Sequence, residues 1–304
     1  MWRYLVKLAI SSLLVWLLVR NRDLGGLARQ MLAVDHAALS AAVAGLFVLL
    51  VPQALRWSVV LGAIGFPIGL RTSLPFTMIG LFFSQTLPSS IGGDGMRAWE
   101  LHRRGVGMST AILSVLIDRA TGLLGICLLV TASLPALLRL APDPAVEAGV
   151  ALLLIVGYAG IALVMLLDRL PEGLRRIPVL REIAKLSTGL RAVVLAPRPA
   201  LAALGTSLVY QLGVVGVVFA LAQGIGVPVG PADCLVIVPL ANLSAVLPIS
   251  IAGWGVREGA FVAGFGFVGV AAADAIALSV LFGLLNMLVG VSGGVVWLAR
   301  RRPG

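Results

Sequence analysis

The stretch LPSSIGGDGMRAW, residues 87–99, indicates the fold because a version of it returns 160 positions later as LPISIAGWGVREG, residues 247–259. Aligned without gaps, the two copies are identical at seven of 13 positions: Leu87/Leu247, Pro88/Pro248, Ser90/Ser250, Ile91/Ile251, Gly93/Gly253, Gly95/Gly255 and Arg97/Arg257. Each copy places a proline, glycines and an arginine inside hydrophobic sequence. A bilayer tolerates such a break only where protein or a water-filled cavity shields the backbone. The pair is therefore a candidate functional site.

The composition around these two stretches is that of a membrane protein. Sixty per cent of the 304 residues are hydrophobic and 12% are charged, and the mean hydropathy is +1.06. We expect an all-α polytopic integral membrane protein with a single transmembrane domain over residues 1–304 and no soluble catalytic domain. The net charge of +10 comes mostly from short loops. It therefore predicts contact with anionic lipid head groups and no nucleic acid partner.

Hydrophobic runs predict about six full spans, over residues 4–19, 37–61, 108–134, 148–167, 200–223 and 273–298. The first run is followed by NRDLGG rather than a small-x-small cleavage site, which favours a retained helix over a signal peptide. Segments 20–36 and 168–199 mix basic and apolar residues at helical spacing, which is typical of helices that lie in the membrane interface.

The two motifs lie in regions that cannot cross a membrane comfortably. Regions 71–105 and 233–266 each hold a short apolar run, a break and a more polar run. We interpret each as a re-entrant hairpin of broken helices, which enters and leaves on one side.

Loop charges predict that the two halves are inverted. The basic loop at 169–198 and the arginine-rich tail belong on the cytoplasmic side of the cell (inner/cytoplasmic) membrane, which places both termini there. Counting spans then puts the first hairpin's ends in the cytoplasm and the second's outside. The chain becomes two inverted repeats, 1–147 and 148–304, although this places the positive segment 20–29 outside. Ser114-Val-Leu recurs as Ser279-Val-Leu, 165 positions later, which supports the repeat.

The first motif is suited to binding an anionic group. A glycine turn before a half-helix exposes backbone N–H groups and the positive end of the helix dipole, and Arg97 adds a bidentate cation. Asp94 has three interpretations: it caps the half-helix, recognises a cationic head group or holds Arg97 in place. The predicted binding residues here are Ser90, Gly93, Asp94, Gly95 and Arg97, with the break at Pro88.

The second motif differs in its charges, because Glu258 follows Arg257. Neighbours on a helix point in different directions, so we expect each to find a separate partner. Either each closes a structural ion pair, or both line the substrate path, and the cost of charges in a bilayer favours the path. The predicted binding residues are Ser250, Gly253, Gly255, Arg257 and Glu258, with the break at Pro248.

Asp118 and Arg119 lie near the middle of the predicted span 108–134 and complete the predicted site. Asp118 could neutralise Arg97 or Arg257. A structural salt bridge and a role in binding a coupling ion both remain open for this pair.

The sequence carries no signature of an enzyme or a cofactor site. His36 and His102 are its only histidines, and neither belongs to a metal cluster. Cys127 and Cys234 lie in apolar segments, which indicates small buried hydrophobes. We therefore predict no cofactor and no catalytic residue.

Three segments resemble the lysylphosphatidylglycerol synthase transmembrane, or flippase-like, family: residues 82–101 (FFSQTLPSSIGGDGMRAWEL), 114–125 (SVLIDRATGLLG) and 247–259. The resemblance implies a fold similar to the flippase half of the bacterial multiple-peptide-resistance protein, without its aminoacyl-transferase domain. It is also compatible with phospholipid, hopanoid or glycolipid substrates.

The leading hypothesis is a lipid flippase that moves a polar lipid between leaflets through a cavity formed by both hairpins. One alternative is an intramembrane transferase that uses Asp94, Asp118 or Glu258 as acid or base. Another is a non-transporting partner of a lipid-modifying or glycosyltransferase enzyme, and a homo-oligomer is compatible with each hypothesis.

Overall fold

The structure is a computed structural model that describes Arg20 and residues 24–86, 91–169, 178–246 and 255–301, and every regular element in these ranges is a helix. The helices are α2 (Leu24–Leu32), α3 (His36–Ala63), α4 (Leu70–Thr86), α5 (Ile91–His102), α6 (Met108–Leu140), α7 (Pro144–Leu166), the 3-10 turn η1 (Leu167–Arg169), α9 (Pro178–Val194), α10 (Pro197–Gly224), α11 (Pro231–Val246), α12 (Val256–Gly266) and α13 (Ala272–Arg301). The prediction of an all-α chain is confirmed.

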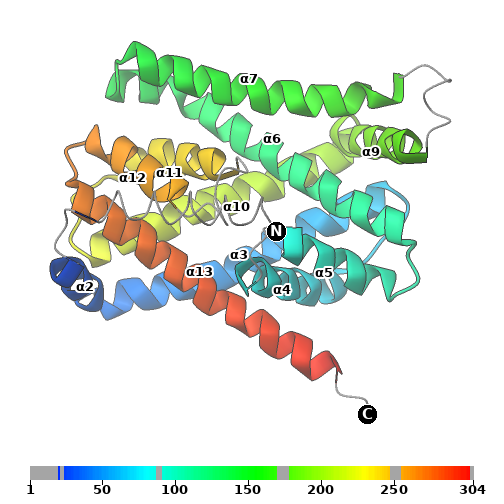
Figure 1. Ribbon diagram of the computed structural model, residues 1–304, viewed down its shortest axis with the longest axis horizontal. Coiled ribbons are helices and arrows are strands. Elements are labelled where there is room, and N and C mark those ends of the chain that lie inside the picture. The colour runs from blue at the N-terminus through cyan, green and yellow to red at the C-terminus, as the bar shows by residue number, and fades with distance from the viewer. Residues whose placement is uncertain (1–19, 21–23, 87–90, 170–177, 247–254, 302–304) are drawn as a thin grey trace.

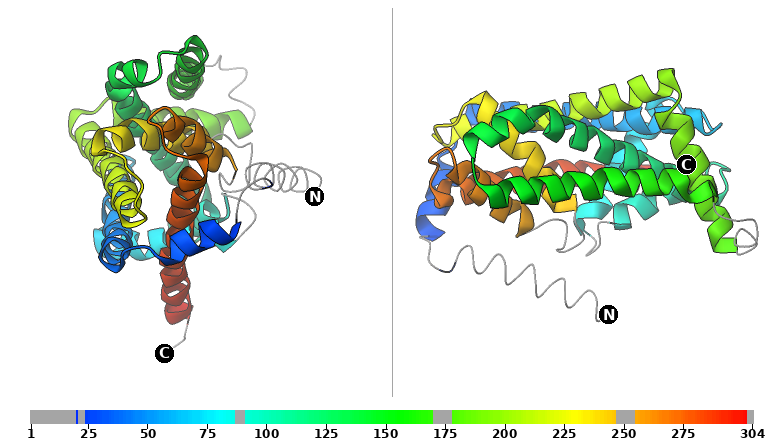
Figure 2. Two further views of the ribbon diagram at one scale, coloured as in Figure 1. Left: turned by 90° about the vertical axis from the view of Figure 1, so that its left-hand side faces the viewer. Right: turned by 90° about the horizontal axis from the view of Figure 1, so that it is seen from above.

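Five of these helices, α3, α6, α7, α10 and α13, are long and apolar enough to cross a membrane. A helix of 28 residues such as α3 is about 42 Å long at 1.5 Å per residue, which exceeds the ~30 Å hydrocarbon core of a bilayer. Large apolar side chains remain exposed on α7, which lies along the rim of the bundle (Figures 1 and 2). The five helices coincide with predicted spans, and the sixth span, over residues 4–19, lies outside the described residues.

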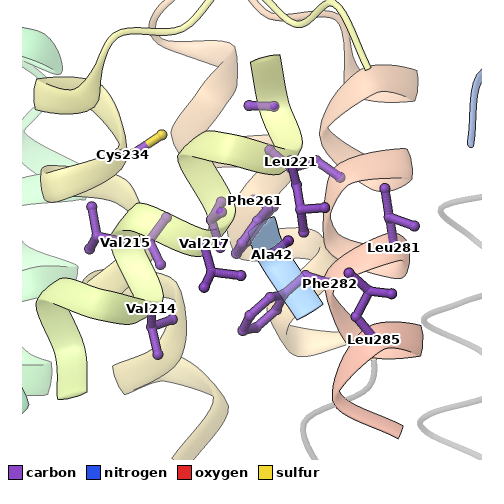
Figure 3. Packing of buried hydrophobic residues seen from close by; sticks show 14 of the residues in the cluster. Ala42, Val214, Val215, Val217, Leu221, Cys234, Phe261, Leu281, Phe282 and Leu285 are labelled. Carbon is purple, nitrogen blue, oxygen red and sulfur yellow. The ribbon is translucent and has the colours of Figure 1, made fainter. Parts of the chain in front are cut away.

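Helices α3 and α10 pack along each other at the centre of the bundle. Glycines bring the two backbones close together: a Cβ on Gly45 would lie 2.9 Å from Val217 Cγ2, and one on Gly213 would overlap the side chain of Leu49. The main apolar core surrounds this contact. Figure 3 shows side chains from five helices converging there, among them Ala42, Val214, Val215, Val217, Leu221, Cys234, Phe261, Leu281, Phe282 and Leu285.

Two pairs of short helices, α4–α5 and α11–α12, contain the repeated motifs. None of the four is longer than 17 residues. Each pair stands between two long helices along the chain, and the pairs lie toward opposite ends of the bundle (Figure 1). Each long helix that follows a pair packs against the other pair, α13 against α4 and α6 against α11. The α13–α4 contact needs a glycine, because a Cβ on Gly293 would overlap the backbone carbonyl of Met78.

Side-chain contacts tie the helix ends together at one end of the bundle, where α4 begins and α5 ends. There Arg104 Nη1 donates to Thr72 Oγ1 at 3.2 Å, and the guanidinium of Arg300 lies 5.1 Å from the ring centroid of Phe76. Exposed basic residues gather at this end: Arg71, Arg103, Arg104, Arg169, Lys185, Arg198 and Arg300.

A group of acidic residues lies at the opposite end of the bundle. Gln30 Nε2 donates to Asp274 Oδ1 at 2.8 Å, and the Asp35 amide donates to the Gly224 carbonyl at 2.9 Å, which joins α2, α3, α10 and α13. The acidic residues here are Asp35, Asp143, Glu147, Asp233 and Asp274, beside Arg29 and Arg139. The bundle therefore has a basic end and an acidic end.

The helices predicted within 20–36 and 168–199 are present as α2 and α9. Helix α9 packs with its apolar face against α6 and α7, where Leu190 and Val193 are fully buried. Ser187 Oγ also donates to the Met165 carbonyl at 2.8 Å. The apolar face of the amphipathic helix α9 thus packs against other helices of the protein.

Candidate functional site

The first motif lies where α4 and α5 touch. A Cβ on Gly93 would overlap Ser84 Oγ and the carbonyl oxygen of Gly80, and a Cβ on Gly80 would lie 2.7 Å from Arg97 Cγ. Helix α5 begins at Ile91, so the glycines predicted to form a turn before the half-helix lie inside the helix. The expected glycine turn is therefore wrong. Close packing on α4 explains Gly93, since only a residue without a side chain fits there.

Arg97 of the short helix α5 is buried between partners on two long helices, α3 and α6. Its side chain is 7% exposed, and its Nη2 lies 2.8 Å from Asp118 Oδ2 on α6. The guanidinium carbon stands 4.3 Å from the ring centroid of Trp57 on α3, a cation–π distance. The Arg97 Nε–H group is buried and has no hydrogen-bond acceptor.

Asp118 is shared with a second buried arginine, Arg56 of α3. Arg56 Nε donates to Asp118 Oδ1 at 2.8 Å, and Arg56 Nη1 lies 3.5 Å from Ser207 Oγ on α10. Gly122 makes room for this arginine, because a Cβ there would lie 2.9 Å from Arg56 Nη1. We call Arg56, Arg97 and Asp118 the buried triad; it links α3, α5, α6 and α10.

The sequence analysis did not include Arg56 in the candidate site, yet Arg56 is buried, with only 8% of its surface exposed. The available signal was its position within the apolar run 37–61, since an arginine inside a span is expected to find a partner. The expectation that Asp118 could neutralise Arg97 agrees with the observed ion pair.

Asp94 lies in the first turn of α5 and pairs with basic residues rather than standing at the N-cap. Its carboxylate accepts a hydrogen bond from Arg119 Nε of α6 and lies 3.9 Å from Arg97 Nη1. Among the three interpretations of Asp94, these contacts favour holding the arginines in place. Gly95 is exposed, and a Cβ there would meet nothing within 4 Å.

The second motif forms a different arrangement at the start of α12. Gly255 is the N-cap residue with φ 87°, a conformation that favours glycine. Glu258 Oε2 accepts the Gly255 N–H at 2.5 Å, and Glu258 Oε1 accepts from Ser279 Oγ of α13 at 3.0 Å. Arg257 Nε donates to the same Ser279 Oγ at 3.1 Å.

The prediction that Arg257 and Glu258 need separate partners is wrong. Arg257 Nη2 lies 2.8 Å from Glu258 Oε1. Both residues lie in the first turn of α12. The Glu258 side chain folds back to cap the helix at Gly255 and also contacts Ser279, and Arg257 donates to the same Ser279. The two side chains therefore converge although their Cα–Cβ bonds point apart.

Five of the predicted positions lie outside the described residues: Pro88, Ser90, Pro248, Ser250 and Gly253. Of the others, the structure joins Asp94, Arg97, Asp118 and Arg119 in one ion-pair network and Gly255, Arg257 and Glu258 in another.

A comparison with protein families matches the model described as the lysylphosphatidylglycerol synthase TM region over residues 4–294. The chain belongs to this family. The resemblance drawn from the three segments is thus confirmed, and the protein is a multi-pass membrane protein of the flippase-like family. A comparison with curated protein sequences finds no match.

In this lysylphosphatidylglycerol synthase TM family member, the chemistry at hand is recognition of charge. Within the described ranges, no three His, Cys, Asp or Glu side chains stand together in a group that could hold a metal ion. The buried triad offers a cation with a free N–H donor, whereas the second network pairs each charge within itself. An anion with oxygen acceptors is the ligand that suits the triad.

Proposed function

We propose that the protein moves a lipid with a phosphate-bearing head group between the leaflets of the cell membrane. The head group passes along a polar path lined by two re-entrant hairpins, α4–α5 and α11–α12, while the acyl chains stay in the bilayer. The family supports membrane transport of this kind, and the buried triad supports the phosphate.

The observation that carries the proposal is the charge of the triad. Arg56 and Arg97 share the carboxylate of Asp118, and Asp94 lies 3.9 Å from Arg97 and also pairs with Arg119. Three arginines and two carboxylates leave this network with one surplus positive charge. A charge inside a bilayer is costly unless it is paired. Arg97 Nε also lacks an acceptor. A phosphate oxygen would supply both the negative charge and the acceptor.

The arrangement of the helix pairs supports inverted halves. The pairs lie toward opposite ends of the bundle (Figure 1), and α13 and α4 pack as α6 and α11 do. Inverted repeats with broken helices are a transporter design, because exchanging the roles of the halves opens the path to the other side. The basic end then faces the cytoplasm. Accessibility of single cysteines at positions 103 and 143 to an impermeant reagent tests this orientation.

The test of transport is reconstitution of the purified protein in liposomes that contain one labelled lipid at a time. The wild type is expected to speed the exchange of phosphate-bearing lipids between leaflets. Arg97→Lys keeps the positive charge but loses the planar guanidinium, whose several N–H donors can bind Asp118 and a phosphate at the same time. It should slow exchange about tenfold or more, because hydrogen bonds to charged groups are lost.

A matched control is Arg191→Gln, which breaks an ion pair with Asp168 on α9 and η1, away from both hairpins. This variant should exchange lipid at the wild-type rate. If wild type, Arg97→Lys and Arg257→Lys all leave exchange at the rate of protein-free liposomes for every lipid class, the proposal fails. Product formation from a lipid-linked substrate in detergent would instead favour a transferase.

A further inference from the structure

Two arginines from distant parts of the chain lie against one aromatic ring at the basic end of the bundle. The guanidinium carbon of Arg104, which follows α5, stands 5.4 Å from the ring centroid of Phe76 on α4. The guanidinium carbon of Arg300, in the last turn of α13, stands 5.1 Å from the same centroid. Helices α4, α5 and α13 thus bring two positive charges to one place.

A hydroxyl group belongs to the same cluster. Arg104 Nη1 donates to Thr72 Oγ1 at 3.2 Å, and the hydroxyl proton of Thr72 has no acceptor among the described residues. Thr72 lies in the first turn of α4, where the helix dipole adds positive potential. We call Thr72, Phe76, Arg104 and Arg300 the end cluster. Its polar groups offer hydrogen-bond donors, which suit the oxygen atoms of an anion.

No carboxylate pairs with the two arginines of the end cluster. Neither guanidinium has an acidic oxygen within 4.0 Å in the part of the chain that the structure describes. Glu100, one turn before Arg104, is 7% exposed and forms no ion pair within that distance. Arg71 precedes Thr72 and Arg103 precedes Arg104, and both are exposed. The surroundings of the cluster therefore carry more positive than negative charge.

Acidic residues elsewhere at the basic end are already paired. On the α9 side, Glu182 binds Lys185 and Asp168 binds Arg191. At exposed sites, contact with an aromatic ring stabilises a guanidinium only modestly, so it offsets little of the repulsion between two like charges. The end cluster would therefore be stabilised by an anion that contacts both arginines.

We propose that Arg104, Arg300 and the Thr72 hydroxyl bind one phosphate group at the basic end, at a site separate from the buried triad. The planar guanidinium matches the geometry of phosphate oxygens, and both arginines are exposed, so their N–H groups can turn toward a common ligand. The phosphate comes either from a lipid head group or from a soluble phosphate.

The end cluster also lies close to the buried triad. The rings of Phe76 and Trp57 are 6.3 Å apart, and Arg97 of the triad stands over the Trp57 ring. A lipid phosphate bound at the end cluster would thus lie beside the proposed path. This connection alone rests on the proposed function, whereas phosphate binding does not.

The soluble-phosphate arm uses the purified full chain in detergent, at constant pH and ionic strength, with chloride replaced stepwise by inorganic phosphate. A ligand that binds the folded state raises the melting temperature with its concentration. For the wild type we expect a rise of about 3 °C per tenfold increase in phosphate above the dissociation constant. Arg104→Gln and Arg300→Gln should each raise the half-saturating concentration about tenfold, and Thr72→Val by a smaller factor.

The lipid arm is run without inorganic phosphate and compares mixed micelles of phosphatidic acid with micelles of diacylglycerol, which lacks the phosphate. If a lipid supplies the phosphate, phosphatidic acid raises the melting temperature of the wild type, and Arg104→Gln or Arg300→Gln removes the difference. A response to inorganic phosphate alone assigns the site to a soluble phosphate. If lipid exchange in liposomes is absent while either response persists, the proposed function fails and this inference stands.

The matched control is Arg198→Gln, which removes one exposed positive charge from the same end of the bundle, at the start of α10 and outside the end cluster. Its half-saturating concentration should stay close to that of the wild type. If Arg198→Gln weakens the response as much as Arg104→Gln and Arg300→Gln do, phosphate senses only the net charge of this end and the proposal is overturned. It is also overturned if neither phosphate source raises the melting temperature, or if Arg104→Gln and Arg300→Gln respond to both sources as the wild type does.

Discussion

The two arginines of the repeated motif occupy matching sequence positions but take their negative charge from different helices. Arg97 of α5 pairs with Asp118 on the following long helix, α6. Arg257 of α12 pairs with its neighbour Glu258 and contacts α13 at Ser279 and at the ring of Phe282. By the 165-residue offset of the Ser-Val-Leu match, Asp118 corresponds to Gly283, and by the 160-residue offset of the motif Glu258 corresponds to Ala98. The two copies therefore keep the arginine at the same position of the motif, but the carboxylate that pairs with it lies on the following long helix in the first copy and on the short helix itself in the second.

Because of this difference, α5 and α12 are attached to the long helices that follow them by contacts of unequal strength. Separating α5 from α6 would break a buried ion pair and leave charges without partners, which is expensive. Separating α12 from α13 would break hydrogen bonds to Ser279, while the Arg257–Glu258 pair could move with α12. If one helix pair moves in the transport proposed above, the contacts favour α12 as the mobile element.

The largest expected effect on stability comes from removing the charge of Asp118. Asp118→Asn should lower the free energy of unfolding by about 3–5 kcal/mol, because Arg56 and Arg97 lose their only shared carboxylate while they remain buried. Chemical unfolding in detergent, followed by circular dichroism, measures the loss. Adding Arg56→Met to Asp118→Asn should restore part of the stability by removing one orphaned charge. A single variant as stable as the wild type would show that the triad is not held as described.

The contact between α4 and α5 provides the next test through two glycines of one helix. Gly93→Ala places a Cβ onto Ser84 and the Gly80 backbone, so it should cost about 1–3 kcal/mol or more through overpacking. Gly95→Ala meets nothing within 4 Å and should stabilise α5 by about 0.5–1 kcal/mol. Unfolding of both variants under one set of conditions gives the comparison. Equal effects would contradict the close approach at Gly93.

Much of the fold is predictable because membrane physics acts on long patterns. Apolar runs of at least 20 residues, such as 37–61, must become helices when no water is available to the backbone. The repeated motif likewise marks both short helix pairs. Helix starts are less predictable, since the glycines of residues 92–95 signal a turn in isolation. Gly93 packs inside α5 against α4, a contact that no local pattern reveals.

The partners of charged residues are predictable only where geometry leaves one choice. Asp118 was an expected partner for Arg97 because both are charges in apolar surroundings. Arg56 was missed, since its distance from both along the chain hides a contact made across helices. The pairing of Arg257 with Glu258 depends on the helix start at Gly255, because Glu258 turns back to cap it. Tertiary contacts and the positions of helix ends therefore determine which charged residues pair, and sequence spacing alone does not predict them.

The second network should be more tolerant of losing its charge than the triad. Glu258→Gln is expected to lower the free energy of unfolding by about 1–2 kcal/mol, less than Asp118→Asn, because the amide oxygen can still accept the Gly255 N–H. Arg257, with a side chain 13% exposed, also keeps its hydrogen bond to Ser279. The same unfolding assay measures both variants. A loss as large as that of Asp118→Asn would remove the proposed difference between the hairpins.

The serines of the repeated Ser-Val-Leu segment also sharpen the comparison, and Ser114→Ala has the smallest effect expected of any variant. Ser279 joins two charged side chains, whereas Ser114 Oγ accepts from the neutral Trp57 Nε1 at 3.2 Å. Hydrogen bonds to charged groups contribute more than those between neutral groups. Ser279→Ala should therefore cost about 1.5–3 kcal/mol at most, and Ser114→Ala about 0.5–1.5 kcal/mol. Amide hydrogen exchange adds a local measure: Ser279→Ala should speed exchange in α12, and Ser114→Ala should leave α12 unchanged. If Ser279→Ala left α12 equally protected, the hydrogen bonds to Ser279 would not be what holds this hairpin against α13.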